Sequence, residues 1–373
     1  MHIISQPSQH PIGLDISDLS LKLVQLKARR HSIKLQTISK LAVPEGYIKG
    51  GKIVKKDAVV ELIKKLTTET IFGKISNKDV VACLPEEKTF VKLIKVVNDK
   101  KKNFSESLAD EIQKNIPLNL AEVNYDWQVI KKEKDHQKIL IGAIEKTIAD
   151  EYHEVLKSAE LNPVALEIES IAIVRALLPR RHNPKKTIII IDIGAKRSSF
   201  IAYADKTILF TVSLPISGDK TTHAISKSLS INHEKAESAK IICGLNKELA
   251  NGAVARALEG QVNSLIKKTA QALQHLFEQY PEYSAIEKIH LCGGGANIKG
   301  LSKIINDRLG VKTVPGNVFS HIHVNPTIEN KHLNEEFATL KNIAQAYKIK
   351  QNFSLQFATA IGLALRGIHL DDL

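Results

Sequence analysis

Apolar and polar residues alternate along the first 43 positions in a way that is typical of strands rather than helices. Three such stretches cover 12–16, 20–26 and 32–43. A turn after Asp15 separates the first two, and a basic break at 29–31 separates the second from the third. We therefore expect a three-stranded meander at the start of the fold.

From residue 54 onward the pattern changes repeatedly between helical and strand-like spacing. Apolar residues three or four positions apart predict helices, whereas short apolar runs predict strands. Helices are expected at 54–70, 105–116, 146–159 and 170–178, and strands at 79–84, 90–97, 124–131, 137–144 and 164–168.

A segment rich in proline and basic residues, 179–186, interrupts this alternation and is interpreted as a linker. Three strands follow it, as they do at the N-terminus. For the second half we expect strands at 187–193, 198–204, 207–214 and 288–292, helices at 220–229, 233–243, 251–279, 301–309 and 355–367, and an irregular polar segment at 316–334.

The two halves of the chain open in the same way. Each has a strand that ends in an aspartate, Asp15 or Asp192, followed by a turn and two more strands. A repeated plan of this kind predicts two related lobes. Clefts between lobes are common ligand sites, so we expect the two turns to face a shared cleft.

Composition narrows the range of functions. A chain of 373 residues is longer than one ordinary domain, and 43% hydrophobic residues are typical of a globular protein. The net charge of +13 would suit a polyanion, but the basic residues are spread along the chain and aromatic residues make up only 5%. We therefore do not expect nucleic acid as a partner.

Two further features bear on the location of the protein. Cys83, Cys243 and Cys292 are far apart and show no metal-ligand spacing, which favours buried thiols in a reducing compartment. Neither a signal peptide nor an apolar run of about 20 residues is present, so a soluble, cytoplasmic protein is expected.

The turn after Asp192 is the first candidate site. A small Gly194-Ala195 pair follows the buried strand, so its amides could hold phosphate oxygens while Asp192 orients water on a magnesium ion. An ordinary hairpin with a solvated aspartate is the alternative. The matching turn after Asp15 has Ser17 where a glycine would be expected and adds the negative charge of Asp18.

A third candidate is the glycine run 293–295, which follows a strand and precedes a helix. This arrangement offers backbone amides and a helix N-terminus to an anion or a nucleotide. Its spacing does not fit the dinucleotide-binding fingerprint. The alternative is a loop that needs glycine for backbone conformations with positive φ.

These three elements, in this order and on repeated lobes, resemble the two phosphate motifs and the adenosine motif of the actin-like ATPases. Further short segments are similar to the PilM family of type IV pilus assembly proteins, on the branch that includes the cell-division protein FtsA. They are Leu84-Pro85-Glu86 with Val91-Lys92-Leu93-Ile94, Glu111 to Pro117 with Val123 to Trp127, Leu161 to Ser170, Ala236 to Lys240, and Ala360 to Arg366.

The resemblance implies an α/β fold of two duplicated ribonuclease H-like lobes around a nucleotide cleft. The first lobe would comprise 11–85 and 156–185, the latter including the linker. An FtsA-like inserted subdomain would occupy 86–155, and the second lobe 186–367, including the adenosine motif and the closing helix.

The resemblance also implies the site. ATP and Mg²⁺ would bind between the lobes, with Asp15, Asp192 and Glu169 as catalytic residues and the two aspartates as metal ligands. Glu169 is equally well placed to act only as a favourable charge at a helix N-terminus, and Glu237 with Lys240 could be a solvated ion pair. The residues expected to contact the nucleotide are Ser17, Ser20, Lys22, Gly194, Ala195, Ser198, Gly218, Glu237, Lys240, Gly293, Gly294, Gly295 and Asn297.

The implied function is a cytoplasmic scaffold on the inner face of the membrane, reached only through its partners. The principal partner would be the N-terminal cytoplasmic peptide of a PilN-like inner-membrane protein, alongside other pilus platform components, the assembly ATPase and a possible homo-oligomer. Ser17 in the first turn predicts slow or absent hydrolysis, with nucleotide as a conformational switch. An FtsA-like filament protein and a small-metabolite kinase are the alternatives.

Overall fold

The computed structural model describes residues 10–29, 32–97, 103–116, 119–178, 186–318 and 354–368. Its first part is the predicted meander of β1 (Ile12–Ser17), β2 (Ser20–Arg29) and β3 (Ser32–Ala42), with antiparallel pairing throughout. β7 (Asp79–Leu84) joins β1 in parallel, and β11 (Asn162–Ile168) joins β7 in parallel. With the short β6 (Phe72–Gly73), the sheet order is β11-β7-β1-β2-β3-β6.

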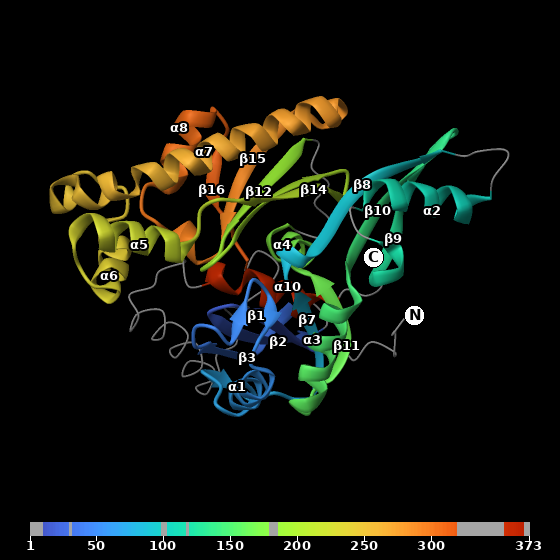
Figure 1. Ribbon diagram of the computed structural model, residues 1–373, viewed down its shortest axis with the longest axis horizontal. Coiled ribbons are helices and arrows are strands. Elements are labelled where there is room, and N and C mark those ends of the chain that lie inside the picture. Colours follow the sequence, from blue (N-terminus) through green and yellow to red (C-terminus); the bar gives the residue numbers. More distant parts are fainter. Residues whose placement is uncertain are drawn as a thin grey trace.

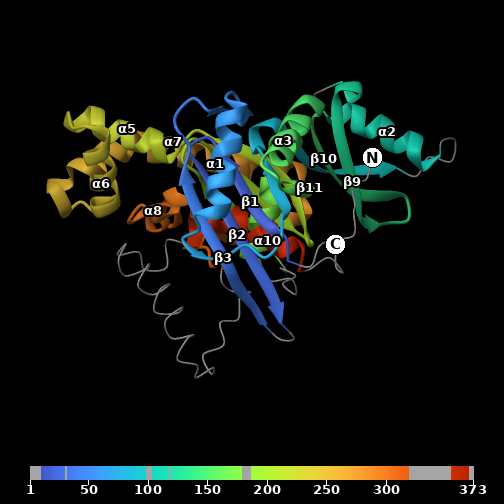
Figure 2. The ribbon, with the colours of Figure 1, turned by 90° about the horizontal axis from the view of Figure 1, so that it is seen from below.

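Helices cover both faces of this first sheet. α1 (Lys56–Thr68) and α3 (Lys146–Ser158) bury Val59, Ile63 and Tyr152 on one face. α4 (Glu169–Leu177) and α10 (Ala358–Arg366) cover the other face. Figure 2 shows α1 in front of the meander and α10 behind it. Apolar side chains on both faces explain why β1 and β7 are buried almost completely.

The second half repeats this plan. β12 (Thr187–Ile193), β13 (Ser198–Ala204) and β14 (Thr207–Leu214) form the second meander. β15 (Ile286–Cys292) and β16 (Thr313–Pro315) add to β12 in parallel, so the order β16-β15-β12-β13-β14 matches β11-β7-β1-β2-β3. The two sheets have the same topology, which confirms the predicted duplication.

The second lobe carries α5 (Gly218–Leu229), α6 (His233–Cys243), α7 (Ala253–Gln279) and α8 (Leu301–Leu309). The long α7 runs along the outer face of its sheet (Figure 1). The main core contains four consecutive isoleucines of β12, from Ile188 to Ile191. A strand with such a run is buried on both faces, as expected for the centre of a sheet that helices cover.

The inserted segment forms β8 (Thr89–Val97), α2 (Phe104–Asn115), β9 (Val123–Lys132) and β10 (His136–Glu145). β9 and β10 pair as predicted, and α2 packs on them through Leu108 and Ile112. The sequence did not predict that β8 pairs with β14, at Lys92 and Phe210. This pairing extends the second sheet to eight strands, so the insert is continuous with the second lobe.

The closing helix α10 packs on elements of the first lobe, although the sequence groups it with the second. Gly13 of β1 and Gly362 of α10 allow this close approach. A Cβ on Gly13 would lie 2.1 Å from the carbonyl oxygen of Ala360, and a Cβ on Gly362 would lie 1.8 Å from that of Ala172. No larger residue fits at either position without moving backbone.

The remaining differences are small. The sequence did not predict β6, β16 or the hairpin of β4 (Ile48–Lys49) and β5 (Lys52–Ile53). Three-residue to four-residue 3₁₀ turns occur at η1 (Glu86–Lys88), η2 (Leu120–Glu122), η3 (Leu249–Gly252), η4 (Pro281–Tyr283), η5 (Gly294–Asn297) and η6 (Ser354–Phe357).

Most of the expected linker 179–186 and of the polar segment 316–334 lies outside the described residues. Within the described part of the chain, no helix is long and apolar enough to cross a membrane.

Candidate functional site

A cleft of about 1490 Å³ lies between the two lobes, and the two Asp-bearing turns face it from opposite sides. Its volume exceeds the roughly 300–1,000 Å³ of ordinary ligand pockets. Every site residue predicted from the sequence lines this cleft: Asp15, Ser17, Ser20, Lys22, Glu169, Asp192, Gly194, Ala195, Ser198, Gly218, Glu237, Lys240, Gly293, Gly294, Gly295 and Asn297. Their individual roles stay predictions.

Asp15 of the first turn is locked in place by two neighbours. The ammonium of Lys22 donates to its Oδ2 at 2.7 Å, and the thiol of Cys83 lies 3.6 Å from its Oδ1. The ion pair is buried, with 11% of the Lys22 side chain and 5% of the Asp15 side chain exposed. Burial opposes the charge of Lys22, but the Asp15 carboxylate outweighs this and raises the pKa of Lys22.

The other two polar residues of the first turn are satisfied within the protein. The hydroxyl of Ser17 donates to the carbonyl oxygen of Ser20 at 2.8 Å. The carboxylate of Asp18 accepts the amides of Gly50 and Gly51, both at 3.0 Å. Asp18 is therefore turned toward the β4–β5 hairpin, which removes the repulsion that its sequence position suggested for a bound phosphate.

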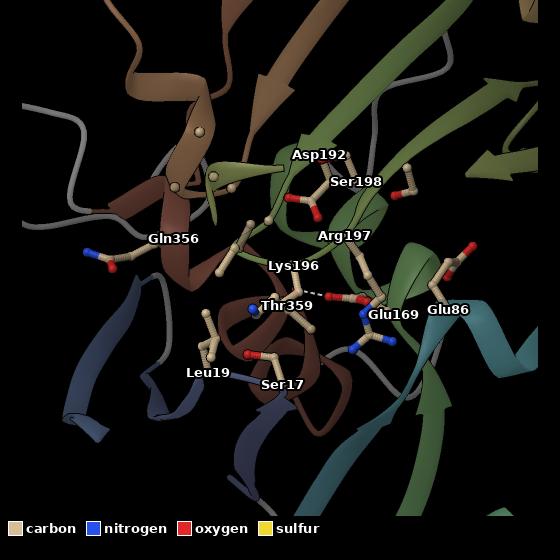
Figure 3. A pocket seen from close by; sticks show the side chains of 18 of the residues that line it. Ser17, Leu19, Glu86, Glu169, Asp192, Lys196, Arg197, Ser198, Gln356 and Thr359 are labelled. Atoms are coloured by element: carbon tan, nitrogen blue, oxygen red, sulfur yellow. Dashed lines mark hydrogen bonds between the residues drawn. The ribbon is translucent and has the colours of Figure 1, made fainter. Parts of the chain in front are cut away.

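Asp192 in the second turn has a more open environment. The thiol of Cys292 donates to its Oδ1 at 3.4 Å, and no described residue bonds its Oδ2. Burial raises the pKa of Asp192 to about 6, although the hydrogen bond from Cys292 lowers it, and the charge of Asp15 adds a smaller rise. Asp192 thus has one oxygen free toward the cleft (Figure 3).

The rest of the second turn is built around backbone hydrogen bonds. The amide of Gly194 donates to the carbonyl of Arg197 at 2.8 Å and closes the turn. The first amides of α5, Gly218 and Asp219, donate to the carbonyls of Gly194 and Ala195 at 2.9 and 2.8 Å. The buried hydroxyl of Ser198 has no partner within the described structure, so it is available to a ligand.

Two further carboxylates enter the cleft near Asp192. Burial, followed by the charges of Asp192 and Asp15, raises the pKa of Glu169 to about 8. Burial also raises the pKa of Glu86, whose carboxylate accepts the amide of Ser170 at 3.1 Å and so caps α4. Burial is the largest cause of these raised pKa values, and for Glu169 and Asp192 neighbouring carboxylates add to it, which is an environment that a divalent cation would relieve.

The glycine run leads into the 3₁₀ turn η5 rather than directly into a helix. Gly293 has φ +76°, as the alternative of a loop that needs glycine predicted, and a Cβ there would also lie 2.5 Å from Oδ1 of Asp192. Gly295 is tight in the same way, since its Cβ would lie 2.2 Å from the Ile193 side chain. Gly294 has open space above it and faces the cleft.

Glu237 and Lys240 form an ion pair at 2.6 Å, but not the solvated one considered as an alternative. Only 9% of the Lys240 side chain is exposed, and its ammonium also donates to the Thr222 hydroxyl at 2.7 Å and the Gly218 carbonyl at 3.1 Å. This network joins α6 to the start of α5 and thus to the second turn.

Sequence reasoning missed several residues of the cleft. Arg197 extends from the second turn between Glu169 and Glu86 (Figure 3). Lys196 bonds Asp219 of its own lobe at 2.9 Å and Glu45 of the first lobe at 3.1 Å. Two adjacent basic residues in a turn of small residues are the signal that could have identified them. Ile241 and Ile242 of α6, which are 61% and 59% exposed, have no such signal.

The residues present fit a nucleotide with a divalent cation. Carboxylates that favour Mg²⁺ converge on one side of the cleft. The unpartnered Ser198 hydroxyl and the open surface over Gly294 provide polar and backbone contacts. Asp192 and Glu169 would hold the cation, because Lys22 already neutralises Asp15.

Comparison with known proteins identifies the family. The model of the family described as type IV pilus assembly protein PilM matches residues 13–368, almost the whole chain. The chain belongs to the PilM family. This confirms the family to which the sequence motifs pointed.

Solved structures agree with this assignment. The chain is 25% identical to the PilM chain of a PilM-PilN type IV pilus biogenesis complex, with a TM-score of 0.77 over 96% of this chain and 98% of that one. The ethanolamine utilization protein EutJ from Carboxydothermus hydrogenoformans is 15% identical, with a TM-score of 0.54 over 96% and 90%. MreB5 of Spiroplasma citri bound to AMPPNP is 14% identical, with a TM-score of 0.53 over 91% and 97%. This PilM-family chain therefore has the predicted actin-like ATPase fold.

Proposed function

We propose that this protein is a nucleotide-binding scaffold of the type IV pilus assembly platform. Membership of the PilM family supports the pilus role. Support for nucleotide binding comes mainly from one observation: two turns with equivalent aspartates face each other across a single cleft that is also lined by a glycine-rich third element. The Mg²⁺ ion that accompanies ATP would supply the positive charge that the buried acids lack.

Both lobes would contribute contacts to the bound nucleotide. Lys22 and Ser20 would contact phosphate oxygens from the first lobe, and the amides of the 194–197 turn with Ser198 from the second. Glu237 and Lys240 would contact the ribose, and Gly294 would lie against the adenosine. The exposed apolar side chains of Ile241 and Ile242 at the cleft suit a base.

Hydrolysis should be slow. Phosphoryl transfer to water needs a group that orients the attacking water and phosphate donors in fixed positions. Glu169, which would hold the cation, would not be free to orient that water, and Ser17 replaces the glycine expected in the first turn. Nucleotide would thus act as a conformational switch.

The partner of this scaffold would be the N-terminal cytoplasmic peptide of a PilN-like inner-membrane protein. The structure with a TM-score of 0.77 is a PilM-PilN complex, and its alignment covers the whole fold, including the insert. Such a peptide would bring the protein to the inner face of the membrane, and other platform components would assemble on it. No described feature favours a metabolite kinase or a membrane-bound filament instead.

Isothermal titration calorimetry with Mg²⁺-ATP tests the proposal. Wild-type protein should bind with micromolar or tighter affinity, and Asp192→Asn should weaken this at least 100-fold. Asp150→Asn, which removes an exposed carboxylate on α3 outside the cleft, is the matched control. A folded wild type that does not bind Mg²⁺-ATP would overturn the nucleotide role and leave an adaptor that works through its peptide partner alone.

A further inference from the structure

Arg197 belongs to the second lobe, but its guanidinium lies in the first. It sits in the turn between β12 and β13, and only 17% of its side chain is exposed. Its Nη2 lies 3.5 Å from Oδ1 of Asp18 in the β1–β2 turn, and its Nη1 lies 4.0 Å from Oε2 of Glu87 in η1. One side chain thus connects three separate elements across the cleft.

The first lobe provides a shaped socket for this guanidinium. Asp18 is held by the amides of Gly50 and Gly51, so its position does not depend on Arg197 alone. Gly51 forms the floor, because a Cβ there would lie 2.3 Å from Pro85 and 3.2 Å from Nη1 of Arg197. The hydroxyl of Tyr152 fixes that floor by donating to the carbonyl of Gly51 at 2.8 Å.

The contacts inside the socket are longer than those of a fully formed ion pair. Guanidinium–carboxylate bonds are usually about 2.7–2.9 Å long, whereas these distances are 3.5 and 4.0 Å. Nη1 is buried and has no hydrogen-bond partner within the described residues. A buried donor without a partner is unfavourable, so a small rotation of the lobes that brings Nη1 within hydrogen-bond distance of Glu87 would lower the energy.

We propose that Arg197 is a latch between the lobes, which tightens on Asp18 and Glu87 when a ligand draws the second turn toward the first. The idea rests on the proposed nucleotide-binding function for the identity of that ligand. Arg197 is the last residue of the turn whose amides would hold phosphate, so a movement of that turn moves Arg197 as well. It is a positioning residue and needs no contact with the nucleotide.

The latch would couple closure of the cleft to a movement of the insert. Glu87 lies in η1, and β8 of the insert starts directly after η1 at Thr89. The neighbouring Glu86 caps α4 through the amide of Ser170. β8 is also paired with β14 of the second lobe. The insert is therefore attached to both lobes, and a change in their angle changes its orientation.

Lys196 provides a matched comparison within the same turn. It also bridges the lobes, by ion pairs to Glu45 and Asp219, but 81% of the Glu45 side chain is exposed. Exposed pairs contribute little and are screened by salt. If charge across the cleft were all that mattered, Lys196→Ala and Arg197→Ala would have similar effects. The latch predicts that only Arg197→Ala changes the distance between the lobes.

Double electron–electron resonance on the full chain measures this directly. Spin labels on Glu61→Cys of α1 and Asp307→Cys of α8 report the distance between the lobes, and a second pair on Glu61→Cys and Gln128→Cys reports the insert. All three labelling sites are exposed in the described structure, whereas the native cysteines are buried. Each pair is measured with and without Mg²⁺-ATP.

We expect Arg197→Ala to lengthen and broaden both distance distributions without nucleotide, to abolish their narrowing by Mg²⁺-ATP and to weaken Mg²⁺-ATP binding about 10-fold. Without nucleotide, Lys196→Ala should give the same two distance distributions as wild type, also at 0.5 M salt. Arg197→Lys, which keeps the charge, should restore part of the closed distribution and guards against a variant that fails to fold.

Two results distinguish failure of the latch from failure of the nucleotide proposal. Unchanged distributions in folded Arg197→Ala, with unchanged affinity, would overturn the latch while leaving nucleotide binding intact. Absence of Mg²⁺-ATP binding by wild type, together with a nucleotide-free distribution that Arg197→Ala broadens, would support the latch and overturn the nucleotide proposal.

Discussion

The two turns that face the cleft have the same topology but opposite electrostatics. In the first turn, Lys22 and Cys83 engage both oxygens of Asp15, and Ser17 and Asp18 are bonded within the lobe. In the second, Asp192 keeps one oxygen toward the cleft, and Lys196 and Arg197 reach across to the other lobe. The duplicated framework thus supports one turn whose polar side chains are all paired and one turn in which a carboxylate oxygen and a hydroxyl have no partner.

The difference indicates that the two turns have different roles in binding a ligand. A turn whose polar groups are all paired is rigid, and it offers a fixed surface to a ligand. A turn with a free carboxylate oxygen, an unpartnered hydroxyl and a guanidinium nitrogen without a hydrogen bond gains the most from a ligand, because these buried groups are not yet compensated. We therefore expect substitutions at equivalent positions of the two turns to have different, and in one case opposite, effects.

The largest effect is expected for the matched pair Asp15→Asn and Asp192→Asn without nucleotide. The first leaves Lys22 buried without its counter-ion, which should lower the free energy of unfolding by about 3–5 kcal/mol. The second removes a carboxylate whose pKa is raised to about 6, and should increase that free energy at pH 8 by on the order of 2 kcal/mol. Urea denaturation measures both, and equal destabilisation by both variants would contradict the comparison.

A somewhat smaller effect is expected from pH. Because the pKa of Glu169 is raised to about 8, its protonated form is favoured in the folded state. Its contribution to stability is complete below its unfolded pKa near 4.5 and is lost as the pH rises through about 8, on the order of 3 kcal/mol. Thermal melts in EDTA should show this loss in wild type and a flatter profile in Glu169→Gln. A parallel profile for the two proteins would disprove the assignment.

The smallest effects concern the glycine run. Gly293→Ala places a Cβ against Asp192 at positive φ and should lower the free energy of unfolding by about 1–3 kcal/mol. Gly294→Ala points into open space and should change it by less than about 0.5 kcal/mol, while weakening nucleotide binding. Chemical denaturation and calorimetry on both variants separate the two roles. The comparison fails if Gly294→Ala proves the more destabilising.

Much of this architecture could be predicted from local pattern. Period-two alternation located β1–β3, and helical spacing located α1, α3 and α7, because each element buries one face of its own residues. The repeated strand–Asp–turn plan predicted the duplication, and the short motifs predicted the PilM family. The sixteen cleft residues were predicted from the resemblance to the actin-like ATPases, which adds Glu169, Glu237 and Lys240 of helices α4 and α6 to the residues of the turns.

What local pattern could not show depends on contacts between distant segments. The pairing of β8 with β14 is set by one register position, Lys92 opposite Phe210, that no periodicity encodes. The place of α10 on the first lobe depends on the absence of side chains at Gly13 and Gly362, which have no special spacing in the sequence. The orientation of Asp18 depends on a hairpin more than 30 residues away.

By itself, then, the sequence determined most of the elements, the duplication, the family and many of the residues that border the cleft, since these follow from neighbouring residues and from the order of motifs. Only the tertiary structure decided which aspartate is neutralised by Lys22, which acids are raised in pKa by burial together, and that Arg197 reaches the root of the insert. These properties depend on distance and burial, which the chain acquires only when both lobes are folded against each other.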